Sequence, residues 1–241
     1  MRLLIVRHGD PDYSIDSLTP KGWKEAEYLS QRLVKEKIDH FYVSPLGRAR
    51  DTAAPTLDKL GRTAEVCDWL REFPAVIQRP DHPDKVAWDW LPADWAGQDI
   101  FYDARRWYEH PIMAEGRVGE QYLAVTGQFD ELLARHGYRR TGPLYAAERP
   151  NDETICFFCH FGLEVVLLSR LLNVSPMPLW HGTCAAPSSV STLYTEERRP
   201  GIASFRMASF GDISHLYAQG EPPAFAARFC ELYTNAHERH D

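Results

Sequence analysis

The sequence has few cysteines and lacks the arrangement of thiols that is typical of secreted, disulfide-bonded proteins. Its five cysteines in 241 residues are odd in number and unevenly spaced, so they do not suggest a disulfide framework. Cys156, Cys159 and His160 match the pattern of covalent c-type haem attachment, but they lie in an apolar segment with two phenylalanines between the thiols. A haem-attachment motif needs an exposed position and export, so we interpret the thiols as reduced and packed inside a cytoplasmic protein.

Long hydrophobic runs and an excess of positive charge are also missing. No stretch is long enough to cross a bilayer, and the apolar run at residues 3–6 is too short for a signal peptide. The net charge is -7, whereas a protein that binds duplex nucleic acid needs a broad basic surface. We therefore expect a cytoplasmic protein with neither membrane nor nucleic-acid partners. Converging arginines can still create a local site for a small phosphorylated ligand.

The composition that remains is that of a globular protein, with 44% apolar and 25% charged residues. Short apolar or β-rich segments predict strands at about residues 3–6, 41–43, 64–69, 154–159, 189–194 and 203–210. Capping and periodicity signals predict helices at about residues 20–37, 45–60, 120–135, 162–172 and from 222 onward. The alternation predicts an α/β fold, arranged as a three-layer α/β/α sandwich with a mostly parallel sheet.

The stretch from about residue 73 to 119 differs from the rest because it is rich in tryptophan, proline and aspartate. Linkers are poor in aromatic residues, so we interpret this stretch as an inserted cap of loops and short helices within one domain spanning residues 1–241. Its tryptophans are expected mainly to form a small core for the cap.

Candidate catalytic and ligand-binding residues follow the ends of predicted strands, where parallel sheets bind ligands. Arg7, His8 and Gly9 follow the first strand: a guanidinium suits phosphate oxygens, and glycine permits close approach of a ligand. The alternative is a chance tripeptide with a solvated arginine. His160 follows a second buried strand, and Glu72 follows the predicted third strand.

A further arginine lies where a cation is normally unfavourable. Ser44-Pro45 predicts the start of a helix, which places Arg48 in or near its first turn, at the positive end of the helix dipole. A bound anion would compensate this arrangement, although a solvated arginine is the alternative.

Together these segments resemble the histidine phosphatase superfamily, which includes the cofactor-dependent phosphoglycerate mutases. The motifs occur in family order and span about residues 1–72 and 154–216. They are Arg7-His8-Gly9, Leu18-Thr19-Pro20-Lys21-Gly22 with Ala26, Ser44-Pro45-Leu46-Gly47-Arg48-Ala49 with Thr52-Ala53, His160, and Asp212-Ile213-Ser214-His215-Leu216.

The resemblance implies a role for each matching residue. His8 would attack phosphorus and become a phosphohistidine, while Arg7, Arg48 and His160 would hold the phosphoryl oxygens beside Gly9. Glu72 would give a proton to the leaving group and then act as base toward water. The resemblance implies no metal and no cofactor.

The sequence departs from the family pattern in two places. Phe161 stands where glycine often follows the second histidine, and an apolar wall is expected there. The short, acidic segment 10–17 lacks the residues that mutases usually carry between the first motif and the first helix.

The proton donor and the residues around the substrate are less sharply defined. Glu72 has the expected spacing, with four carboxyl groups as alternatives: Asp68, Asp81, Asp84 and Glu164. Phe161 and His181 are candidates for substrate contact, whereas His215 is expected to be structural. Arg71 and Arg79 could contact a second acidic group of the substrate, although a solvated position is the preferred interpretation.

We therefore predict a phosphomonoesterase that acts on a small phosphorylated metabolite, with the cap selecting the leaving group. A phosphomutase and an inactive phospho-ligand-binding protein are the alternatives. A homodimer is compatible with the sequence, which determines neither the oligomeric state nor the substrate.

Overall fold

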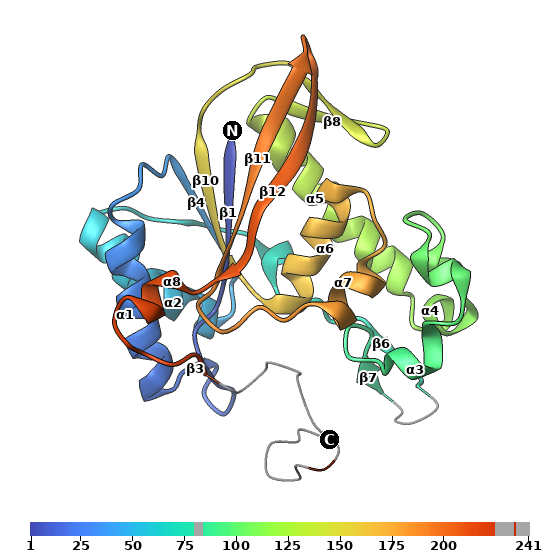
Figure 1. Cartoon of the computed structure of the whole chain (residues 1–241), viewed down its shortest axis with the longest axis horizontal. Helices are drawn as coiled ribbons and strands as arrows, with labels where there is room; N and C mark the ends of the chain where they lie inside the picture. Colours follow the sequence, from blue (N-terminus) through green and yellow to red (C-terminus); the bar gives the residue numbers. More distant parts are fainter. Residues whose placement is uncertain (80–83, 225–233, 235–241) are drawn as a thin grey trace.

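The computed structural model describes residues 1–79, 84–224 and 234, and it contains a central eight-stranded sheet (Figure 1). The strand order is β5-β4-β10-β1-β11-β12-β9-β8. In this order the strands span Glu65–Val66, His40–Val43, Thr154–Cys159, Arg2–Arg7, Val190–Arg199, Ile202–Asp212, Leu144–Ala147 and Tyr138–Thr141. The first four strands pair in parallel and the remaining pairs are antiparallel, so the sheet is mixed.

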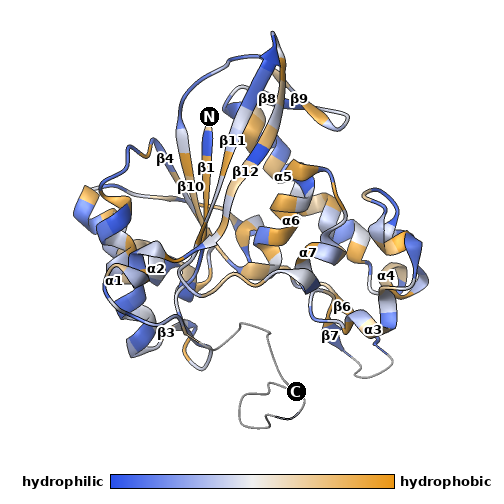
Figure 2. Cartoon of the chain, in the orientation of Figure 1, coloured by the Kyte–Doolittle hydropathy of each residue, from blue (hydrophilic) through white to orange (hydrophobic). Residues whose placement is uncertain are grey.

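Alternate residues of β1 face opposite sides of the sheet and are buried by different helices. Leu4 and Val6 pack in one core with residues of α1 (Pro20–Leu33) and α2 (Gly47–Leu60). Leu3 and Ile5 pack in a second core with α5 (Val118–Arg135) and α6 (Phe161–Leu172). Figure 2 shows hydrophobic residues concentrated on the central strands and on α6. These two cores give the three-layer α/β/α arrangement and confirm the predicted α/β class. The sheet was predicted to be mostly parallel, but it is mixed, because β11, β12, β9 and β8 form antiparallel pairs on one side of β1.

The segment predicted as a cap forms short elements beside α6 (Figure 1). They are β6 (Val76–Ile77), β7 (Lys85–Val86), α3 (Pro92–Trp95), the 3₁₀ turns Asp99–Tyr102 and Trp107–Glu109, and α4 (Pro111–Glu115). Trp90, Trp95 and Trp107 are buried in a third core, which also includes Val165 of α6 and Trp180 of α7 (Pro176–Gly182). Packing is thus the role of these three tryptophans, as expected.

Several element boundaries differ from the sequence predictions. The second helix begins at Gly47 with Leu46 as its N-cap, not at the Ser44-Pro45 signal. The predicted third strand is only β5, followed by a 3₁₀ turn at Asp68–Leu70. Strands β8 and β9 were not predicted, because β8 is a polar edge strand and each strand has only four residues, too few to show a clear hydrophobic alternation.

The remaining short elements are β2 (Pro11–Asp12), β3 (Ser17–Leu18) and α8 (Ser214–Tyr217). Within residues 1–79 and 84–224, no helix has the length and apolar character needed to span a membrane. The helix predicted from residue 222 onward lies almost entirely outside the described residues.

Candidate active site

His8 lies directly after β1, and its backbone N–H donates to the carbonyl of Cys159 at the end of β10 (3.0 Å). Its side chain is 2% exposed, and Nδ1 lies 2.7 Å from the Gly9 carbonyl oxygen. A carbonyl only accepts, so Nδ1 carries the proton and Nε2 retains its lone pair. Burial lowers the pKa of His8 well below its usual value, and Arg7 and Arg48 lower it further. The imidazole is therefore neutral near pH 7 and can act as a nucleophile.

The backbone around His8 is held by close contacts that only glycine permits. The N–H of Gly9 donates to Oγ1 of Thr52 in α2 (2.9 Å). A β-carbon on Gly9 would lie 2.9 Å from the carbonyl oxygen of Gly22, and one on Gly22 would lie 2.2 Å from the carbonyl oxygen of Asp10. The loop after β1 and the start of α1 thus approach each other backbone to backbone, which fixes the position of the His8 ring.

His160 follows β10, beside β1 in the sheet, and brings a second imidazole to the same strand ends. Its ring centroid lies 5.1 Å from that of His8, and the ring planes are inclined by 58°. Nε2 lies 2.8 Å from Oγ of Ser44, whereas Nδ1 has no hydrogen-bond partner among the described residues. Burial, followed by the proximity of His8, Arg48 and Arg7, lowers the pKa of His160 well below its usual value. When the Ser44 hydroxyl donates to Nε2, Nδ1–H is left as a donor for a ligand oxygen.

Arg7 is the last residue of β1 and is 2% exposed. Its guanidinium donates to the carbonyl of Ala185 and lies over the ring of Phe161, with Cζ 5.4 Å from the ring centroid. Phe161 is itself 2% exposed, so the apolar wall expected beside the second histidine is present. The ring and the carbonyl orient the guanidinium fork, whose planar set of donors suits phosphoryl oxygens.

Arg48 occupies the first turn of α2, and the anion that compensates it comes from the protein. Oδ1 of Asp16 lies 2.5 Å from Nη1 of Arg48, and Oδ2 accepts from the Gly47 N–H (2.7 Å). Partial burial opposes ionisation of Asp16, but these hydrogen bonds outweigh it and lower the pKa of the carboxyl. Nε of Arg48 has no partner among the described residues, so part of the guanidinium is available to a ligand. Sequence analysis did not single out Asp16.

Glu72 lies after the 3₁₀ turn, and its carboxylate contacts the start of α6. Oε1 accepts from the N–H groups of Phe73 (2.8 Å) and Leu163 (2.9 Å), and Oε2 accepts from Gly162 (3.3 Å). Burial raises the pKa of Glu72, and the three N–H groups and the charge of Arg7 only partly oppose this. A carboxyl group in these surroundings holds a proton to higher pH than a solvated one.

The alternative carboxyl groups differ sharply in their surroundings. Asp68 is 89% exposed at its side chain, Asp84 is exposed, and Asp81 lies outside the described residues. Glu164 of α6 is 1% exposed, and neither of its oxygens makes a hydrogen bond of normal geometry within the described part of the chain, although Ser191 is close. Burial raises the pKa of Glu164 to about 7, and the charges of Arg7 and Glu72 also act on it.

His181 and His215, also considered in the sequence analysis, each make hydrogen bonds to other residues of the protein. His181 accepts from the Trp90 N–H at Nε2 (3.1 Å) and donates from Nδ1 to the Met177 carbonyl (2.8 Å). One nitrogen is thus engaged by the cap and the other within α7 itself, and substrate contact by His181 stays a prediction. His215 contacts Oγ of Ser188 (3.0 Å), whose N–H donates to the His8 carbonyl (2.9 Å), as expected of a structural residue.

Two aromatic residues near the site were not predicted. Tyr13 lies in the short acidic segment 10–17, with its ring 5.3 Å from Cζ of Arg48, and is 66% exposed. Trp88 of the cap donates from Nε1 to the Phe73 carbonyl (2.8 Å) and meets Phe161 edge to face, with centroids 6.4 Å apart. Neither stands in a motif, so only the spatial arrangement reveals them.

Arg79, expected to be solvated, has a side chain that is only 8% exposed.

The curated relatives of the chain are named as phosphatases. Phosphoserine phosphatase 1 of Hydrogenobacter thermophilus is 26% identical over 212 residues, covering 83% of this chain and 89% of that protein. Putative phosphoserine phosphatase 2 of the same organism is 32% identical over 120 residues, covering 46% of this chain and 54% of that protein.

Similar solved structures extend over nearly the same length. The phosphoserine phosphatase of Entamoeba histolytica, in complex with 3-phosphoglyceric acid, has a TM-score of 0.57 and 19% identity, covering 89% of this chain and 98% of that chain. A mycobacterial glucosyl-3-phosphoglycerate phosphatase complexed with VO3 has a TM-score of 0.54 and 20% identity, covering 87% of this chain and 98% of that chain. The family model for branch 1 of the histidine phosphatase superfamily matches residues 3–207, and the chain belongs to this superfamily.

Proposed function

We propose that the protein is a phosphomonoesterase that hydrolyses a small phosphorylated metabolite through a phosphohistidine on His8. The observation that carries the proposal is the pairing of His8 and His160, whose rings lie 5.1 Å apart at the ends of adjacent strands. Two neutral imidazoles with two arginines around them provide a nucleophile and donors for a phosphoryl group. The names of the curated relatives support phosphatase activity.

In the first half of the proposed reaction, Nε2 of His8 attacks phosphorus. The N–P bond forms as the bond from phosphorus to the ester oxygen breaks, and the leaving oxygen takes a proton from Glu72. Arg7, Arg48 and Nδ1–H of His160 donate to the equatorial phosphoryl oxygens, on which charge is spread in the transition state. The raised pKa of Glu72 favours its role as acid.

In the second half, the Glu72 carboxylate accepts a proton from water as the water oxygen attacks phosphorus. The N–P bond breaks, His8 regains its lone pair, and phosphate leaves. None of these steps needs a metal ion, because the arginines and imidazoles supply the positive charge and the donors. Hydrolysis is therefore expected to be unaffected by an excess of chelator.

Hydrolysis is preferred over mutase chemistry because of the segment 10–17. A mutase must retain its substrate for re-phosphorylation and keep water away, and the residues that mutases use for this are missing there. The segment instead places Tyr13 over Arg48, and this tyrosine is mostly exposed. Transfer within phosphoglycerate with little phosphate release would reverse this assignment.

The test is a panel of phosphorylated metabolites, with released phosphate as the readout and phosphoserine as the first substrate because of the relatives' names. The panel also includes phosphoglycerate and an aryl phosphate, and each is measured with and without chelator. We expect phosphate release that is insensitive to chelator. Loss of activity in chelator while the protein stays folded, restored by a divalent ion, would exclude the proposed metal-independent mechanism.

A further inference from the structure

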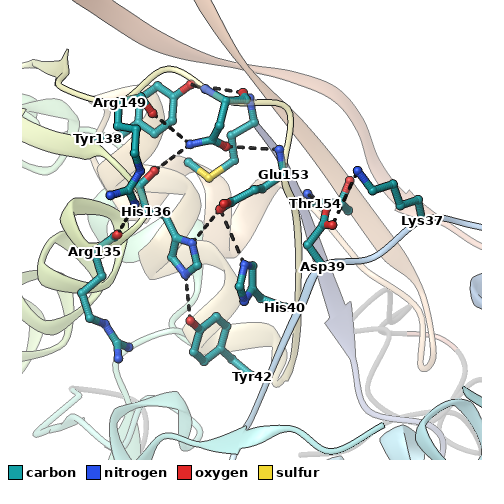
Figure 3. Close-up of polar contacts among 12 residues, drawn as sticks. Lys37, Asp39, His40, Tyr42, Arg135, His136, Tyr138, Arg149, Glu153 and Thr154 are labelled. Carbon is teal, nitrogen blue, oxygen red and sulfur yellow. Dashed lines mark hydrogen bonds and ion pairs between the residues drawn. The ribbon is translucent and has the colours of Figure 1, made fainter. Parts of the chain in front are cut away.

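Three side chains with metal-binding atoms meet at the opposite end of the sheet from the candidate active site (Figure 3). His40 begins β4, Glu153 precedes β10, and His136 is the C-cap of α5. His160 follows the other end of β10, so the six residues of this strand separate the two sites by about 20 Å.

The ligand atoms lie at separations that suit a single small cation. Oε2 of Glu153 lies 2.9 Å from Nδ1 of His136 and 3.6 Å from Nε2 of His40, and the three ligand atoms all lie within 4.8 Å of one another. Ligand atoms about 2.0–2.2 Å from a tetrahedral zinc ion are about 3.3 Å apart. The observed distances bracket this value, so small side-chain movements would complete the coordination.

The surroundings of His136 hold its ring in place. Nε2 of His136 lies 2.8 Å from the hydroxyl of Tyr42, and the side chain is only 9% exposed. When Nδ1 binds a cation, Nε2 keeps the proton and donates it to Tyr42. Metal-binding histidines usually donate their second N–H in this way, which fixes the tautomer and the orientation of the ring.

We propose that His40, His136 and Glu153 form a binding site for one divalent transition-metal ion, with zinc as the best fit. Two imidazoles and one carboxylate suit zinc and its first-row neighbours, whereas calcium and magnesium prefer sites made of oxygen ligands. The His40 and Glu153 side chains are 41% and 32% exposed, so the ion can enter from solvent and water can complete its coordination.

Nearby cations do not oppose the ion strongly, because they have their own partners. Nη2 of Arg135 lies 3.2 Å from Glu65, and Nζ of Lys37 lies 3.6 Å from Asp39. A bound ion would connect the end of α5 to the starts of β4 and β10. We infer a structural role, in which the ion stabilises this end of the sheet without entering the reaction.

The first experiment is a calorimetric titration of metal-free protein with zinc, followed by thermal unfolding with and without zinc. We expect one zinc ion per chain and a higher melting temperature in its presence. Visible absorption of added cobalt provides an independent signal of imidazole and carboxylate coordination. Absence of binding at this stoichiometry would overturn the proposal.

Variants separate this site from adventitious binding. His40→Gln removes a partly exposed ligand and should leave the fold intact, yet weaken zinc binding at least ~10-fold. Glu153→Gln should also leave the fold intact and weaken zinc binding to a similar extent. Glu148→Gln, an exposed residue paired with Arg139, is the matched control and should bind zinc normally.

Two further measurements show whether zinc binds at a different site in the protein. Zinc binding in a His8→Ala background should be unchanged, because the active site lies at the other end of β10. If His40→Gln and Glu153→Gln both bind zinc as the wild type does, then the ion binds elsewhere and the proposal fails. Because the ion would stabilise the fold without entering the reaction, chelator should lower the melting temperature but leave phosphate release unchanged at temperatures where the protein stays folded, so either proposal can fail without the other.

Discussion

The carboxylate of Glu72 lies against the α-carbon of Gly162. A β-carbon on Gly162 would be 2.8 Å from Oε1 of Glu72 and 2.8 Å from Cδ1 and Nε1 of Trp88. The glycine therefore allows the carboxylate to reach the N–H groups at the start of α6. The family resemblance suggested glycine one position earlier, at residue 161, and the structure gives a physical reason for glycine at 162.

This contact predicts the effect of Gly162→Ala. The added methyl group must displace Glu72, Trp88 or both, and overpacking of this kind typically costs about 1–3 kcal/mol of folding stability. We expect reduced phosphatase activity together with a lower free energy of unfolding, measured by steady-state kinetics and urea denaturation. Gly127→Ala is the control, because a β-carbon there meets nothing within 4 Å. Equal behaviour of the two variants would show that the close approach to Glu72 is unimportant.

Replacement of His8 tests the nucleophile. His8→Ala should lower the rate by several orders of magnitude, because the covalent route is lost, while circular dichroism shows an intact fold. Phosphate that is acid-labile and base-stable should be trapped on the wild type and not on the variant. A variant that keeps a large share of the wild-type rate would exclude the phosphohistidine mechanism.

Local signals predicted the strand-end residues well. A short apolar strand followed by Arg7-His8-Gly9 or by His160 fixes where these side chains lie, since the chain leaves a parallel sheet at its carboxyl edge. The hydroxyl of Ser44 was misinterpreted as a helix cap, because a capping signal and a residue that positions His160 look alike in sequence.

Contacts between distant segments could not be predicted. Asp16 reaches Arg48 across 32 positions, and the cluster of His40, His136 and Glu153 joins three separate elements. The antiparallel half of the sheet was only partly foreseen, because β8 and β9 are short and partly polar. Such features depend on tertiary packing and not on local periodicity.

Buried Glu164 predicts a dependence of stability on pH. Its pKa is about 7 in the folded protein and 4.5 in the unfolded chain, so the folded state binds more protons between these values. Stability therefore falls as pH rises from about 4.5 to 7, by up to ~3 kcal/mol for this group. Glu164→Gln should reduce this fall, measured by urea denaturation at pH 5 and pH 8.

A second buried carboxyl provides the comparison for Glu164. Burial also raises the pKa of Glu25 to about 7, so Glu25→Gln should remove a similar part of the fall. Substitution of both residues should make the free energy of unfolding still less dependent on pH. A Glu164→Gln protein whose stability falls as steeply as that of the wild type would show that Glu164 is ionised in the native state.

The role of Glu72 is tested by comparing leaving groups. An alkoxide is a poor leaving group and needs a proton, whereas a nitrophenolate leaves without one. If Glu72 is the general acid, Glu72→Gln should slow phosphorylation by alkyl phosphates about 10²–10⁴-fold and by nitrophenyl phosphate far less. Rapid-quench measurement of the first turnover separates this step from hydrolysis of the phosphohistidine, in which Glu72 acts as base. The raised pKa of Glu72 also predicts that the variant changes the pH dependence of alkyl ester cleavage.

Three outcomes of this comparison separate the carboxyl groups. Equal slowing of both substrates would mean that Glu72 only holds the start of α6 in place through Gly162 and Leu163. No slowing of either would exclude Glu72 and move the role to another carboxyl group, with Glu164 the next to substitute because it is buried beside Arg7. Selective slowing of the alkyl ester is expected, because Glu72 combines a raised pKa with a carboxylate held at the start of α6, the helix that begins directly after His160.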